Sequence, residues 1–208
     1  MLGFLMSVCH VVILVQDHFV DPNLIETMQT AEMLRPSSLA LIGPEGSGQM
    51  IEYFPELVIV HNKAGLDDMC PERLNNYEEF YRRVFVYGGS QLKANTGKVR
   101  CDEYVQDWRA NFAKTNWKMG EINLFVLPSF EDDNDGGCDS EDRSSSGYGG
   151  MSSFEDHVTA LRRKVVSIRP VHLTTAKLTE KMWLKFAEKT WDNIKNCSFY
   201  SEYSRLLN

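Results

Sequence analysis

The run of residues 11–15 constrains the fold of this chain more than any other stretch. Five apolar residues follow one another there without a polar break, and Gln16 and Asp17 end the run abruptly. A strand with one solvent-exposed face alternates apolar and polar side chains, whereas an unbroken apolar run is typical of a strand buried on both faces. The run therefore predicts an interior strand of a parallel α/β sheet, with polar residues at the end where such sheets bind ligands.

Two more short apolar runs, at residues 57–60 and 122–127, predict further strands. Asp21 and Pro22 predict the start of a helix, because aspartate caps free N–H groups and proline has the backbone angle of a first helical residue. Apolar spacing and capping residues predict helices over residues 22–34, from Pro71 onward, from Ser152 onward, and over 179–195. Strands thus alternate with helices, which favours an α/β fold with a parallel sheet.

Composition limits the partners of the chain. Of its 29 acidic residues, seven lie in residues 131–142, where no basic residue occurs. The remaining acids equal the 22 lysines and arginines in number, so no basic surface for direct nucleic-acid contact is expected. We expect a single domain, with residues 37–54 as an irregular loop and 131–151 as a mobile acidic insertion rich in glycine and serine.

The cysteines and histidines favour neither a disulfide framework nor a metal site. The five cysteines are widely spaced along the chain, and none has a metal-ligand spacing to a histidine. This usage is typical of a reducing, cytoplasmic location. The apolar start at residues 2–15 lacks a basic segment and is too short to cross a bilayer, so no membrane association is expected.

Two stretches imitate nucleotide-binding motifs. Residues 43–50 have the glycine spacing of a phosphate loop, but Gln49 stands where the lysine is needed and Met50 where the hydroxyl is needed. An irregular surface loop is the favoured interpretation. The sequence Asn62-Lys63-Ala64-Gly65 resembles the base-reading N-K-x-D of GTP-binding proteins, with glycine in the aspartate position. An ordinary strand-to-helix turn is the alternative interpretation.

The last predicted helix carries Trp183 and Trp191, which are eight residues apart and therefore on one face. We predict that both belong to the core. A role in binding a partner is the alternative, because exposed aromatic side chains often mark interfaces.

Five segments together resemble the SMG-nine family, the GTPase-like subunits of the kinase complex of nonsense-mediated mRNA decay. They are SVCHVVILVQD (7–17), QTAEM (29–33), NKA (62–64), LTEK (178–181) and EYSRLL (202–207). The resemblance implies a fold of the P-loop NTPase, G-domain-like type. Residues 1–208 would be the C-terminal portion of that domain, an incomplete doubly wound parallel sheet lacking the phosphate-loop half.

The resemblance also implies a function and a site. The chain would be a non-catalytic regulatory and scaffolding subunit that pairs with an SMG-eight-like G-domain protein. It would modulate the SMG-one kinase, which phosphorylates UPF-one. The alternative is a nucleotide hydrolase whose catalytic half is encoded upstream. Asn62, Lys63 and Ser129 would be the base-side contacts. No cofactor is expected in this chain alone, because a purine nucleotide (ATP, GTP or GDP) would require the missing half.

The same resemblance predicts a weakness at the first strand. In a G-domain the strand of the phosphate loop pairs beside residues 10–15. Its absence would leave unpaired backbone groups and uncovered valine and isoleucine side chains, which form a template for aggregation. We therefore expect the chain to be poorly behaved and prone to aggregate when it is alone.

Overall fold

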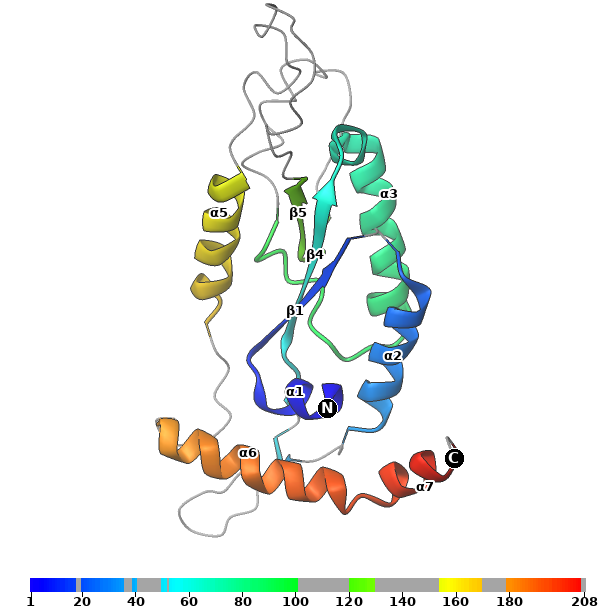
Figure 1. Cartoon of the computed structure of the whole chain (residues 1–208), viewed down its shortest axis with the longest axis vertical. Helices are drawn as coiled ribbons and strands as arrows, with labels where there is room; N and C mark the ends of the chain where they lie inside the picture. Colours follow the sequence, from blue (N-terminus) through cyan, green and yellow to red (C-terminus); the bar gives the residue numbers. More distant parts are fainter. Residues whose placement is uncertain are drawn as a thin grey trace, which may run out of the picture.

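A three-stranded parallel sheet forms the centre of the protein (Figure 1). A computed structural model describes residues 1–17, 20–35, 39–40, 50–51, 53–100, 120–129, 154–169 and 179–206. The strands are β1 (Val11–Gln16), β4 (Glu56–Ala64) and β5 (Leu124–Pro128), in the order β1-β4-β5. The α/β class and the parallel sheet are therefore confirmed. The complete strand order of a P-loop NTPase stays a prediction.

Helices flank the sheet on both sides (Figure 1). They are α1 (Leu2–Val8), α2 (Pro22–Met33), η1 (Leu66–Met69), α3 (Pro71–Tyr81) with its π-helical continuation η2 (Arg82–Tyr87), α5 (Phe154–Ser167), α6 (Glu180–Lys195) and α7 (Ser198–Leu206). The predicted cap of α2 is confirmed, because Oδ1 of Asp21 accepts the N–H of Asn23 at 3.0 Å. At the start of α6, the hydroxyl of Thr179 accepts the N–H of Met182 at 3.3 Å.

Several described elements, among them α1, β2, β3 and α7, were not predicted. The apolar start of the chain contains the short helix α1 before β1 begins, and nothing in its composition separates the two. Within the loop predicted at 37–54, β2 (Leu39–Ala40) pairs antiparallel with β3 (Met50–Ile51). The predicted insertion at 131–151 and the predicted cap at Ser152 lie outside the described residues. Among the described helices, none is both long and apolar enough to cross a membrane.

The predicted interior position of the first strand is wrong in this structure. β1 is an edge strand, paired with β4 alone in the described sheet. Ile13 and Val15 are 44% and 56% exposed. The physical reason is that an unbroken apolar run does not determine how many strands lie beside it. In the described sheet α5 contacts β5, the strand farthest from β1. The uncovered valine and isoleucine side chains predicted for this strand are thereby confirmed.

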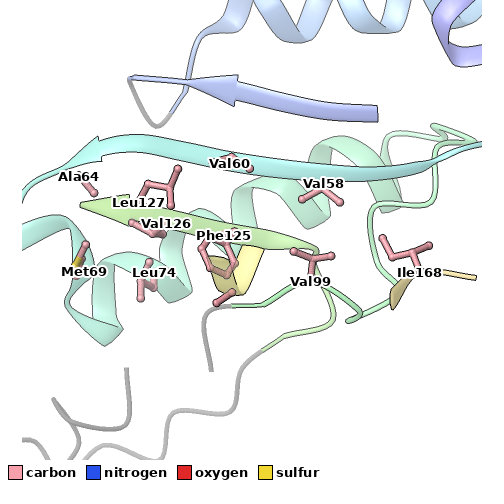
Figure 2. Packing of buried hydrophobic residues seen from close by; sticks show 11 residues of the cluster. Val58, Val60, Ala64, Met69, Leu74, Val99, Phe125, Val126, Leu127 and Ile168 are labelled. Carbon is pink, nitrogen blue, oxygen red and sulfur yellow. The ribbon is translucent and has the colours of Figure 1, made fainter. Parts of the chain in front are cut away.

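Two buried clusters hold the sheet to its helices. On one face, Val58, Val60 and Phe125 pack against Ala160 of α5 and Leu74 of α3. Figure 2 shows Phe125 on β5, among the labelled side chains of this cluster. On the other face, a second cluster joins the sheet to α1, α2, α3 and η2; its fully buried members include Met6, Met28, Leu57, Ile59 and Tyr81.

Helix α6 packs on α1, and its two tryptophans lie at the edge of this contact. The indole N–H of Trp183 donates to the carbonyl of Val8 at 3.0 Å, and Trp191 meets Phe4 edge-to-face at 5.3 Å. Both side chains nevertheless remain exposed, at 36% and 37%. Their predicted core position is therefore wrong. Phe186 and Ala187 form the buried face of α6 instead.

A buried amide fixes the connection between α3 and β5. Asn123, which is fully buried, donates from Nδ2 to the carbonyls of Leu57 and Lys93, and its Oδ1 accepts the N–H groups of Lys98 and Val99. The side chain of Asn123 thereby ties residues 93–99 to the start of β4. Thr96 extends this network, because it accepts from Asn123 and donates to the nearly buried Glu56.

Candidate functional site

The three residues predicted as base-side contacts lie together at the carboxyl ends of β4 and β5. Asn62 and Lys63 belong to the last residues of β4, and Ser129 follows β5 directly. The N–H of Ser129 donates to the carbonyl of Ala64 at 3.0 Å, which joins the two strand ends. This edge is where open parallel sheets place their ligands. Whether these residues contact a nucleotide stays a prediction.

A β-bulge shapes the end of β4. His61 pairs with Val126 and Ala64 with Pro128, so Asn62 and Lys63 together face one residue of β5. Lys63 has a φ of 56°, in the left-handed region that side chains other than glycine rarely adopt. Bulges re-aim side chains and occur frequently beside functional sites. The sequence did not signal this bulge, because asparagine and lysine are ordinary residues after a strand.

The side chains of Asn62 and Lys63 both bind Asp17, which directly follows β1. Nζ of Lys63 lies 2.7 Å from Oδ2 of Asp17, and Nδ2 of Asn62 donates to Oδ1 at 3.2 Å. The side chains of Lys63 and Asp17 are 65% and 46% exposed, so water screens this ion pair and it contributes at most about 1 kcal/mol. Asp17 was expected at a ligand-binding strand end, but its pairing with residues 62 and 63 was not predicted.

Two substitutions at Lys63 separate the effect of its left-handed backbone on stability from the effect of losing its ion pair. Lys63→Gly and Lys63→Ala both remove the ion pair with Asp17, but only glycine adopts a positive φ without a steric cost. We expect Lys63→Gly to be more stable than Lys63→Ala by about 1 kcal/mol in urea denaturation. Equal stabilities of the two variants would contradict the left-handed conformation at this position.

The aspartate position of the motif is built differently from the N-K-x-D pattern. Gly65 directly precedes η1, and its N–H donates to Oδ2 of Asp68 at 3.0 Å, while the N–H of Asp68 donates back to the Gly65 carbonyl at 3.1 Å. The bond to the Asp68 carboxylate is the half of a capping box that glycine permits, and the bond between the two backbones closes the first turn of η1. Nη1 of Arg73 binds the other oxygen of Asp68 at 3.0 Å. A Cβ atom on Gly65 would lie 3.5 Å from Oδ2 of Asp68.

These contacts do not fit a guanine base. A guanine-reading site needs a carboxylate acceptor beside a lysine stem, and Gly65 supplies no side chain. The carboxylate of Asp68, which lies against Gly65, already binds the helix start and Arg73. An aspartate at position 65 would point its charge at Asp68, which is unfavourable. The polar ends of Asn62 and Lys63 are directed at Asp17.

The other candidate sites supply no residue to the site at the carboxyl ends of β4 and β5. The phosphate-loop imitation at residues 43–49 lies outside the described residues. Where the structure describes side chains, no three of His, Cys, Asp and Glu gather as they would around a metal. A cavity of about 470 Å³ lies between α1, α2 and the α6–α7 region, lined among others by Leu2, Ala31, Ile194 and Tyr203. It shares no lining residue with the strand-end site.

Comparison with known proteins gives one consistent answer. No protein-family model matches the chain. It is 36% identical over 99% of its length to nonsense-mediated mRNA decay factor SMG9 of Xenopus laevis, and 32% identical over 98% to the Salmo salar factor of the same name. The Caenorhabditis elegans factor SMG9 is 25% identical over 99% of the chain. The chain spans 41% of the Xenopus and Salmo proteins. The resemblance seen in its motifs is thus confirmed, and the chain is homologous over nearly its whole length to a part of SMG9.

Proposed function

We propose that the chain acts in nonsense-mediated mRNA decay as a regulatory and scaffolding subunit, by protein contact and without catalysis. The observation that carries this proposal is its similarity to vertebrate SMG9 factors over 98–99% of its length. In this proposal its partners are an SMG-eight-like G-domain protein and the SMG-one kinase, whose phosphorylation of UPF-one it modulates in the cytoplasm.

The geometry at the strand ends supports the non-catalytic part of the proposal. Lys63 and Asn62 bind a carboxylate of the chain itself, and glycine occupies the position of the base-reading aspartate. The alternative, a nucleotide hydrolase with an upstream catalytic half, needs a base contact that these residues do not provide as they stand. We therefore propose that the role of this chain does not depend on nucleotide bound at Asn62, Lys63 or Ser129.

Affinity purification of the tagged chain from cells, followed by mass spectrometry, tests the proposal. We expect the kinase and the related G-like protein to be recovered. The double variant Asn62→Ala/Lys63→Ala should recover both to the same extent, because its two changes alter exposed polar contacts and leave the core intact.

Recovery of neither partner by the unmodified chain would overturn the proposed partners. If the unmodified chain recovers them and the double variant does not, the independence from the Asn62–Lys63 pair is wrong. A variant that accumulates to the level of the unmodified chain is required for this comparison, which quantitative blotting of the input establishes.

A further inference from the structure

We propose that the hydroxyl group of Tyr81 positions Asp17 through Gln16, and thereby couples helix α3 to the site at the strand ends. Asp17 is the residue whose carboxylate binds the side chains of Asn62 and Lys63. The inference goes beyond the proposed function, because it concerns how this site is held and not which proteins the chain contacts.

The hydrogen-bonded ladder between β1 and β4 ends before Asp17. Its last register pair is Gln16 and His61, so Asp17 lies beyond the paired part of the strand. The contacts of its carboxylate with Asn62 and Lys63 are exposed, and water weakens them. The residue before Asp17 therefore has a large influence on where this carboxylate lies.

A buried hydrogen bond holds that preceding residue. Nε2 of Gln16 donates to the hydroxyl of Tyr81, although the two residues are 65 positions apart. Gln16 is 8% exposed and Tyr81 is fully buried, so water does not compete for this bond. Burial also raises the pKa of the Tyr81 phenol, which keeps the group neutral at physiological pH. The end of β1 is thus fixed to α3 by one side-chain pair.

Tyr81 lies where the helix changes its type. It is the last residue of α3, and the π-helix η2 begins at Arg82. Turns of π-helix are rare and occur frequently at functional sites. The ring of Tyr81 stacks on that of Phe85 at 6.3 Å, within the core cluster that joins the sheet to α1, α2, α3 and η2. The junction of α3 and η2 therefore fixes the position of the Tyr81 hydroxyl.

This coupling acts in both directions, as any coupling between two sites must. A contact that displaces α3 or η2 weakens the bond of Gln16 and frees Lys63 from Asp17. A partner that withdraws Lys63 from Asp17 changes the α3–η2 junction in turn. The side chain of Arg83 and residue Tyr87 are each 72% exposed, so η2 is accessible to such a contact.

Acetylation of the purified chain by a limiting amount of an N-hydroxysuccinimide ester, followed by mass spectrometry, tests the proposal. An amine held in an ion pair reacts slowly, so the rate at Lys63 reports its contact with Asp17. Asp17→Asn should raise this rate by up to about fivefold, the factor that an exposed ion pair contributes to an equilibrium constant. Tyr81→Phe removes only the hydroxyl and should raise the rate at least about twofold. The exposed Lys185 of α6 is the internal reference and should keep its rate.

Two controls separate positioning from a general loosening of the fold. Tyr77→Phe removes a phenol hydroxyl one turn earlier on α3, where it interacts with Arg73, and should leave the rate at Lys63 unchanged. In the Asp17→Asn background, Tyr81→Phe should add no further increase, because its effect passes through Asp17.

A second variant removes the other half of the buried bond. Gln16→Met takes away the donor and should act as Tyr81→Phe does, so it decides the question if Tyr81→Phe does not fold. An unchanged rate at Lys63 in the folded variants would overturn the proposal. So would an equal increase for Tyr77→Phe, or an increase for Tyr81→Phe that persists in the Asp17→Asn background.

Discussion

Asn123→Ala is expected to lower the free energy of unfolding by about 3–5 kcal/mol. The amide is fully buried and accepts the backbone N–H groups of Lys98 and Val99 while it donates to the carbonyls of Leu57 and Lys93. Alanine removes these bonds together, and each buried polar group that loses its partner costs about 1–3 kcal/mol. Urea denaturation followed by circular dichroism measures the change.

A second asparagine of the chain provides the matched control. Asn62 is partly exposed, and its Nδ2 donates to Oδ1 of Asp17 at 3.2 Å. Asn62→Ala should therefore cost less than about 1 kcal/mol, because water replaces the lost bond. If Asn123→Ala were as stable as Asn62→Ala, the buried network would not stabilise the fold as described.

Phe125→Ala is expected to cost about 3–5 kcal/mol, which is enough to unfold much of a marginally stable domain. The ring is fully buried at the centre of the cluster between the sheet, α5 and α3 (Figure 2). Alanine leaves a cavity that the neighbouring Val58 and Val60 cannot fill, since both are held in β4. Thermal unfolding and the fraction of soluble protein report the loss.

Two further substitutions separate a cavity effect from a general loss of apolar surface. Phe125→Leu keeps most of the volume and should cost only about 1–2 kcal/mol. Val166→Ala removes an apolar side chain that is 76% exposed and should change stability by less than about 0.5 kcal/mol. Equal losses for Phe125→Ala and Val166→Ala would show that the core does not lie where the structure places it.

Local signals were sufficient to predict much of the fold. The apolar run after residue 10, the capping pair Asp21 and Pro22, and the spacing of the final helix correctly predict β1, α2 and α6. Each of these signals depends on neighbouring residues, and the alternation of strands and helices follows from them. The parallel sheet is then the arrangement that such an order requires.

The remaining features depend on contacts between distant residues. An unbroken apolar run shows that a strand is shielded from water but does not show which neighbours shield it. The run alone therefore predicted an interior strand, and only the family resemblance indicated an exposed edge at β1. The pairing of Asp17 with Lys63 joins residues 46 positions apart. The bulge at the end of β4 is a property of the paired strands. The predicted site residues lie together as expected, but only the structure reveals that Asp17 binds two of them.

The half-life of a transcript with a premature stop codon, relative to the same transcript without it, tests the central claim most directly. Cells that lack the chain should degrade the premature-stop transcript more slowly, while the control transcript keeps its half-life. Expression of the unmodified chain and of Lys63→Ala should each restore rapid decay. An unchanged half-life on removal of the chain would contradict its role in this decay pathway. Failure of a normally accumulating Lys63→Ala variant to restore decay would contradict the proposal that the chain acts by contact alone.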